Sequence, residues 1–399
     1  MIMNSDSESS IHRRGGGLTD RVSGGLTEFS QREELTTRLR NILHEYPPGL
    51  GAFNEFLQNA DDAGARSFAV LLATAGAGAA EGELLHPALE AFEGPALYFY
   101  NSATFSERDF ASISSIGLSG KGADASSIGR YGLGFNVAYH FTDVPTFVSR
   151  KTLVMFDPHG THLPGGMCGL RANFAPGEDS ALARGERFSR TMDGFRAIAP
   201  LLRGEEATAA AADGSGDVLR SGFDGTLFRL PLRTAAQAAA SKITATSYSV
   251  DEASRLLREF ASSASELLLF LQNVENIAVY ECNAHDPARR LVRVHVANAT
   301  DALREHRAAV SQRAKARGAS AAAAEEEEER AYELIVRTVS DDAAVDDATW
   351  LVEAAAPTLD PPSASAASAS SCGGHDPLAP AGEPPTAGEL RFLESAVQV

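Results

Sequence analysis

The stretch Gly51–Arg66, GAFNEFLQNADDAGAR, has the spacing of an amphipathic helix, and the rest of the chain can be interpreted around it. At about 100° per residue, an arc roughly 60° wide holds the polar residues Glu55, Asn59, Asp62 and Arg66. The opposite side holds the apolar residues Phe53, Phe56, Leu57, Ala60 and Ala63. We therefore predict a helix that buries one face and presents a base, an amide and an acid on a narrow strip. A surface helix with a merely solvated polar side has the same pattern.

A second stretch, Ser127–Asp143, SIGRYGLGFNVAYHFTD, places three glycines directly before an apolar run with helical spacing. The glycines are Gly129, Gly132 and Gly134. Glycines at the entrance of a helix leave backbone N–H groups uncovered, and the positive end of the helix dipole then faces an anion, usually a phosphate. The two stretches together indicate a nucleotide site.

The combination of these strings resembles a known superfamily. EFLQNADDAGA and IGRYGLGF resemble the N-box and the second glycine motif of the GHKL ATPases, which include gyrase, the large heat-shock chaperone, histidine kinases and mismatch-repair ATPases. The fuller set LQNADDAGA, GPALYFYN, GRYGLGFNVAYHFTD, TLVMFDPH, LPG and DGTLFRLPLR resembles the ATPase module of the sacsin family of chaperone-like proteins. The resemblance runs from about Phe29 to Tyr280. Several unrelated strings in the right order are more specific than a lone glycine motif.

The resemblance implies an α/β sandwich of the GHKL (Bergerat) type. A mixed, largely antiparallel sheet would carry the two N-terminal helices and the glycine-motif helix on one face. Alternating or continuous apolar residues predict strands near residues 68–72, 97–100, 146–148, 153–156, 223–232, 277–281, 290–296 and 332–339. Further helices are expected after an N-cap at Ser106 and after an N-cap at Ser249 or Asp251.

Composition divides the chain into four parts. Residues 1–27 are predicted to be a disordered tail, residues 28–282 the ATPase domain, residues 283–352 a small accessory α+β unit with a charged helix, and residues 353–399 a disordered low-complexity tail. Residues 117–127 resemble the lid that closes over the phosphates in the superfamily; an ordinary surface loop has the same composition.

Charge and cysteine usage limit the partners and the compartment. The formal net charge of −18 argues against nucleic acid or an anionic membrane surface as a general partner. Cys168, Cys282 and Cys372 are far apart, which predicts neither a disulfide framework nor a zinc site. The sequence contains no apolar run of about 18 residues and begins without an apolar signal core. We expect no membrane partner and a cytoplasmic location, and nothing in the sequence excludes the nucleus.

The resemblance implies ATP and Mg²⁺ as ligands and assigns roles to individual residues. Hydrolysis needs a carboxylate that activates water and donors that stabilise the developing charge. Glu55 matches the general base, and Asn59 matches the amide that holds Mg²⁺, a cation that needs only one or two protein ligands beside the phosphates. Gly132, Gly134 and Phe135, after Gly129, would form the phosphate-facing turn and the start of the helix behind it.

The adenine pocket is where this chain departs from most of the superfamily. Asp62 and Ala63 would flank the pocket, and the Thr226 hydroxyl would help to bind adenine. The Asp that accepts the adenine amino proton in most members is replaced here by Asn101, as is common in sacsin-like modules. An amide carbonyl can accept the same hydrogen bond, but without the charge that strengthens it. Three histidines, His140, His159 and His162, are interpreted as loop or core residues.

Two classes of function stay open. The first is an ATP-binding, slowly hydrolysing chaperone-like module whose lid closure is coupled to the handling of client or co-chaperone proteins. The second is a non-enzymatic interaction module that kept the fold but lost useful nucleotide binding. Glu55 and Asn59 favour the first class, and Asn101 favours the second. A mismatch-repair function also uses an N-box, but the string GRYGLGFNVAYHFTD matches the chaperone branch.

Overall fold

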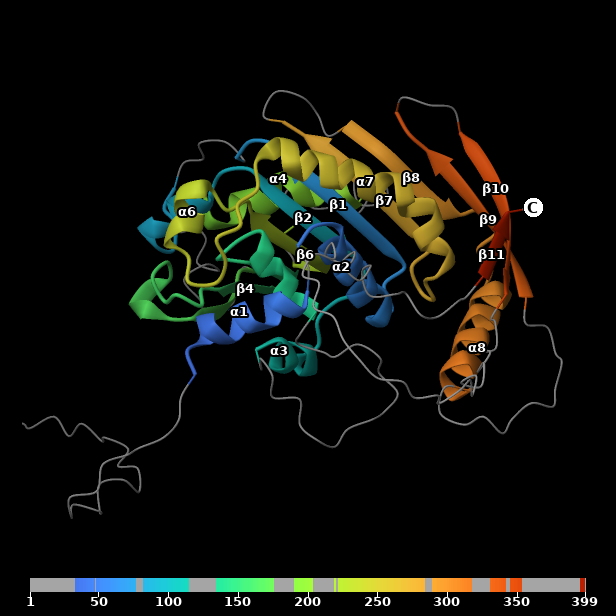
Figure 1. Ribbon diagram of the computed structural model, residues 1–399, viewed down its shortest axis with the longest axis horizontal. Helices are drawn as coiled ribbons and strands as arrows, with labels where there is room; N and C mark the ends of the chain where they lie inside the picture. Colours follow the sequence, from blue (N-terminus) through green and yellow to red (C-terminus); the bar gives the residue numbers. More distant parts are fainter. Residues whose placement is uncertain are drawn as a thin grey trace, which may run out of the picture. The chain divides into compact units, whose positions relative to one another are not determined.

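The computed structural model (Figure 1) describes residues 33–46, 48–76, 82–114, 134–175, 190–203, 219, 222–283, 289–317, 331–341, 345–353 and 395–398. Residues up to Glu34 belong to one unit and residues from Leu35 to a second one. The fold given below is that of the second unit. Among the described residues, no helix is both long and apolar enough to cross a membrane.

One sheet organises this unit, with its strands in the order β11-β10-β9-β8-β7-β1-β2-β6-β3-β4-β5. The strands are β1 (Ser67–Ala73), β2 (Ala96–Asn101), β3 (Thr146–Arg150), β4 (Thr152–Phe156), β5 (Gly169–Asn173), β6 (Phe223–Pro231), β7 (Asn276–Cys282), β8 (Arg289–Val296), β9 (Ala331–Val339), β10 (Asp346–Glu353) and β11 (Ser395–Gln398). β1 and β7 are parallel, and every other neighbouring pair is antiparallel. The predicted mixed, largely antiparallel sheet is confirmed.

The described helices are α1 (Leu35–Glu45), α2 (Leu50–Asp62), α3 (Glu107–Ile113), α4 (Arg190–Arg203), α6 (Ala235–Ala240), α7 (Val250–Leu269) and α8 (Asp301–Arg317), with the 3-10 helices η2 (Pro87–Phe92), η3 (Gly134–His140) and η4 (Pro164–Gly166). Four of the described helices, η2, α3, α6 and α7, begin at side-chain caps, whereas α2 begins after Gly49 without one. Ser106 and Ser249 form capping boxes at the starts of α3 and α7. The predicted N-cap Ser106 is confirmed, and of the two residues predicted to cap α7 the structure has Ser249, with Asp251 in the first turn.

Of the three helices predicted for one face of the sheet, α2 and η3 share a buried apolar cluster with α7 and with the alternating strand residues Phe68 and Val70. α1, the third, buries Leu39 and Leu43 in a smaller cluster with Tyr139 of η3. Phe56 of α2 stacks on Phe99 of β2 with the ring centroids 4.2 Å apart, and Phe53 meets the same ring edge-on at 5.2 Å. These contacts place the apolar side of α2 on the sheet, so its polar strip faces away from it.

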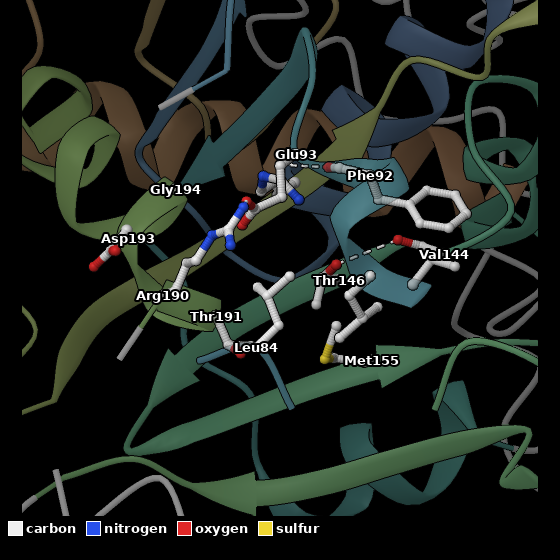
Figure 2. A pocket seen from close by; sticks show the side chains of 12 residues that line it. Leu84, Phe92, Glu93, Val144, Thr146, Met155, Arg190, Thr191, Asp193 and Gly194 are labelled. Carbon is white, nitrogen blue, oxygen red and sulfur yellow. Dashed lines mark hydrogen bonds and ion pairs between the residues drawn. The ribbon is translucent and has the colours of Figure 1, made fainter. Parts of the chain in front are cut away.

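The opposite face of the sheet is covered by α4 and η2, which our sequence interpretation did not include. α4 buries Met192, Phe195, Ile198, Ala199 and Leu202 against Leu71 and Leu227. A cavity of about 40 Å³ between η2, α4 and β6, large enough for a few waters, contains the paired side chains of Arg190 and Glu93 (Figure 2). Arg229 donates to the carbonyl of Phe92 at 2.7 Å there. Glu93 supplies the compensating negative charge, so this cavity is a bonded junction rather than an anion site.

α2 is shorter than predicted, because it ends at Asp62. Gly64 has φ +75°, and the N–H groups of Gly64 and Ala65 donate to the carbonyls of Asp61 and Ala60 at 2.9 and 3.0 Å. This arrangement is a Schellman C-cap, which needs a residue in the left-handed region. Arg66 therefore lies in the turn before β1, 3.7 Å from Glu275, and not on the polar strip of the helix. The prediction for Arg66 is wrong.

The segment expected as an accessory unit continues the same sheet. β8 pairs with β7, β9 with β8 and β10 with β9, and α8 begins at Asp301. Within the expected tail at residues 353–399, Ser395–Gln398 pairs with β10 as β11. Residues 1–27 and the run Glu325–Glu329 lie outside the described part of the chain.

The C-terminal turn of α2 is held by Asp61, whose side chain is only 8% exposed. Its carboxylate accepts hydrogen bonds from the backbone N–H groups of Gln272, Asn273 and Val274 at 2.7–3.1 Å. The side chain of Asn273 donates back to the Asp61 carbonyl at 2.8 Å. Hydrogen bonds to a charged acceptor are stronger than those between neutral groups. The loop after α7 therefore fixes the end of α2.

Asp61→Ala should lower the free energy of unfolding by about 2–4 kcal/mol, because it leaves three backbone donors without their acceptor. Urea denaturation of the full chain would measure this loss. Asp62→Ala, which removes the neighbouring exposed carboxylate, is the control and should stay within about 0.5 kcal/mol of wild type. Equal losses in the two variants would show that the carboxylate of Asp61 does not hold the loop.

Candidate functional site

A cavity of about 110 Å³ opens between α2, α3 and the ends of β2 and β6. Its walls are Phe56, Asn59, Ala63, Asn101, Ala103, Thr104, Phe105, Asp109, Ser112, Ile113, Phe135, Thr226 and Phe228. Five of the residues proposed from the sequence are among them, namely Asn59, Ala63, Asn101, Phe135 and Thr226. The volume suits a group of about one or two rings, since complete ligand pockets usually exceed about 300 Å³.

The polar strip of α2 lies against the start of η3. A Cβ atom added at Gly134 would lie 2.7 Å from Oε2 of Glu55 and 3.3 Å from Nδ2 of Asn59. Only glycine leaves this space open, so the last glycine of the motif meets the strip at its two predicted functional residues. Within the part of the chain that the structure describes, no hydrogen bond occupies the carboxylate of Glu55 or the amide of Asn59.

The environment of Glu55 suits a base. The side chain is half-buried, and this burial raises the pKa of its carboxyl group above 4.5, with a smaller contribution from the negative charge of Asp62. A raised pKa makes the ionised carboxylate a stronger proton acceptor near neutral pH. Asp62 itself is exposed and does not line the cavity.

Asn101 and Thr226 face one another across β2 and β6, where they are directly paired in the strand register. Asn101 Oδ1 accepts from the Ala103 N–H at 3.0 Å, and Thr226 Oγ1 donates to the Ala103 carbonyl at 2.8 Å. Gly225 has φ +133°, and an added Cβ would lie 2.8 Å from the Asn101 carbonyl. The glycine of the DGT string is therefore needed because β6 approaches β2 closely at this point.

A buried ion pair holds the far end of η3. Arg233 is fully buried and donates to the carbonyls of Tyr139 and His140 at 2.7 and 2.9 Å. It also binds Oδ1 of Asp143 through Nε and Nη2 at 3.2 and 2.7 Å. Because the guanidinium satisfies carbonyls and a carboxylate together, its burial is compensated. η3 is thus anchored behind Gly134.

The histidines have structural partners. His140 Nε2 lies 2.7 Å from the Tyr46 carbonyl, and burial holds its pKa below that of a free imidazole. His162 Nδ1 lies 3.0 Å from Oδ1 of Asp157, and His159 Nε2 accepts from the Lys242 N–H at 3.0 Å. The described residues contain no group of three or more His, Cys, Asp or Glu side chains that could hold a metal ion. The loop and core interpretation of these histidines agrees with their contacts.

Some predicted site residues are not among the described residues, and the prediction omitted one residue that contacts the site. Gly129, Gly132 and the lid-like residues 117–127 lie outside the described residues. Ser149 was missed, although its hydroxyl donates to the Gly225 carbonyl at 2.9 Å and lies 3.1 Å from Thr226 Oγ1. In the sequence, Ser149 stands out only as a serine that follows the apolar residues Phe147 and Val148 in β3. Asp109, which also lines the cavity, accepts from the Ser106 N–H and hydroxyl and so caps α3.

Comparisons with known proteins relate this geometry to a family. The sacsin domain family model matches residues 32–293, which is well over half of the chain. Human sacsin is 34% identical over 258 residues, covering 63% of this chain and 5% of that protein. A crystal structure of the N-terminal domain of a DNA repair protein is 9% identical with a TM-score of 0.33, covering 79% of this chain and 69% of that one. Since the family model matches most of the unit that carries the cavity, the chain belongs to the sacsin domain family.

Proposed function

We propose that this member of a chaperone-related family binds a magnesium nucleoside triphosphate, with ATP as the expected form, and hydrolyses it slowly. The observation that supports this most is that a Cβ added at Gly134 would lie 2.7 Å from Glu55 and 3.3 Å from Asn59, and that Asn59 also lines the cavity together with Asn101 and Thr226. The base would occupy the cavity, and the phosphates would extend over Gly134.

The side chains present suit a magnesium ion bound through the phosphates. Mg²⁺ prefers oxygen ligands and takes one or two from the protein, and Asn59 Oδ1 supplies one. When bound, the cation neutralises phosphate charge and polarises the terminal phosphoryl group. Glu55, one turn earlier on the same helix, would orient and deprotonate the attacking water, while backbone N–H groups at the start of η3 stabilise developing charge.

Client or co-chaperone proteins are the proposed macromolecular partners, with nucleotide-dependent closure of the lid as the coupled motion. Membership of a chaperone-related family supports this part of the proposal. The alternative, an interaction module with a degenerate nucleotide site, is favoured by the uncharged Asn101 and the small cavity.

Calorimetric titration of the full chain with ATP, with and without Mg²⁺, tests the choice, combined with a phosphate-release assay. Saturable Mg²⁺-dependent binding supports the proposal. No binding at millimolar nucleotide would leave the interaction module as the function.

Asn59→Ala should weaken the affinity for Mg·ATP by about tenfold or more, and leave metal-free ATP unchanged, since the lost contact acts through the cation. Calorimetry with ATP in Mg²⁺ or in a chelator would measure both. Gln58→Ala is the control, because Gln58 neighbours Asn59 and does not line the cavity. If Asn59→Ala binds Mg·ATP as wild type does, Asn59 holds no cation.

Glu55→Gln should lower turnover by on the order of 10² or more and leave the ATP affinity within a few-fold, because the amide keeps the shape and loses the basicity. Since the folded-state pKa of Glu55 is raised, wild-type turnover should fall on acidification at a higher pH than an ordinary glutamate would give. The variant should lack this acidic limb. Unchanged turnover in Glu55→Gln would assign the base to another residue.

Gly134→Ala should lower turnover about tenfold or more with little change in thermal stability. The new methyl group would displace the Glu55 carboxylate, which is the end of a flexible side chain, from its place. Gly94→Ala is the matched control, since a Cβ there meets no atom within 4 Å. Thermal melts and initial rates of the two variants would test this, and wild-type turnover in Gly134→Ala would contradict the placement of Glu55.

A further inference from the structure

We propose that Asn101 sets the base selectivity of the cavity, and that the cavity accepts 6-oxopurine nucleotides such as inosine triphosphate at least as well as ATP. This inference rests on the proposed function, because it concerns the base of the nucleotide that the cavity would bind.

The hydrogen bond from Ala103 determines what Asn101 offers to a ligand. A backbone N–H can donate only to the amide oxygen, so its 3.0 Å contact fixes the orientation of the Asn101 amide. Asn101 is 8% exposed and lines the cavity. Its NH₂ group has no hydrogen-bond partner within the described ranges. The uncommitted group of Asn101 is therefore a donor.

Thr226, directly opposite Asn101 in the register, offers the complementary group. Its single hydroxyl proton is shared between the Ala103 carbonyl at 2.8 Å and Ser149 Oγ at 3.1 Å. Ser149 uses its own proton on the Gly225 carbonyl at 2.9 Å. Thr226 Oγ1 consequently presents a lone pair to a ligand. The ends of β2 and β6 therefore place an uncharged donor, the Asn101 NH₂ group, next to an acceptor, Thr226 Oγ1.

A 6-oxopurine carries the matching edge. Its O6 accepts where Asn101 donates, and its N1–H donates where Thr226 accepts. Adenine placed the same way would set its amino group against the Asn101 NH₂ and its N1 lone pair against Thr226, and a donor without an acceptor weakens binding in a buried site. Adenine matches only when its N1 faces Asn101. A carboxylate in place of the Asn101 amide would instead accept a hydrogen bond from the adenine amino group.

The test is competition of inosine triphosphate and ATP for the full chain in Mg²⁺, since the two ligands differ only at the edge under discussion. Wild type should bind inosine triphosphate within about threefold of ATP or more tightly. Asn101→Asp keeps the acceptor for the Ala103 N–H and replaces NH₂ by oxygen. Its preference should move towards ATP by about tenfold or more, in line with a changed base contact.

Asn276→Asp on β7 is the matched control. It makes the same change of charge, and its side chain keeps the Arg293 Nε contact, which is 2.9 Å long in the wild type, away from the cavity. Its nucleotide preference should equal that of wild type. The ratio of the wild-type affinities for inosine triphosphate and ATP is measured without any variant. This ratio alone tests the inference if Asn101→Asp is unstable. Wild type that binds ATP and rejects inosine triphosphate tenfold overturns this inference and leaves the proposed function standing, whereas wild type that binds neither overturns both.

Discussion

The placement of α2 on the sheet is the constraint on which the rest of the site depends. Two different forces set it. Phe53 and Phe56 pack on Phe99, which fixes the rotation of the helix about its own axis. The carboxylate of Asp61 binds three backbone N–H groups of the loop after α7, which fixes the position of its last turn. Once both are set, helical geometry alone determines where Glu55 and Asn59 lie.

η3 is the second fixed element, and it is held from the opposite end. Arg233 binds the carbonyls of Tyr139 and His140 and the carboxylate of Asp143, deep in the protein. Breaking a buried pair of this kind leaves an uncompensated charge, which is why such networks keep one arrangement. The approach of Gly134 to the α2 strip therefore depends in part on Asp61 and Arg233, neither of which lines the cavity.

Local patterns predicted much of this fold, and long-range partners explain what they missed. The apolar residues Phe68, Val70 and Leu72 predicted β1, because every second residue of a strand lies on the same face of the sheet; β1 is in fact buried on both faces from Phe68 to Ala73. The end of α2 at Gly64 was missed since the polar spacing continues through Arg66, although glycine after a helix is a common C-cap. Asp61 and Asp62 are identical in type and adjacent in sequence. Only the loop at residues 272–274, far along the chain, distinguishes the structural carboxylate from the exposed one.

The two ends of the candidate site differ in electrostatic character, and this difference bears on the choice between the two functional classes. The α2 and η3 end offers a carboxylate and an amide beside the closely packed Gly134, whereas the β2 and β6 end offers only neutral hydrogen-bonding groups. Neutral protein groups that contact the base add less binding energy than a charged group would. If a nucleotide binds, most of its affinity must then come from the phosphates and the cation. The close approach of Gly134 to Glu55 and Asn59 leaves room for no side chain at position 134, and the calorimetric comparison of the two classes depends chiefly on this end of the site.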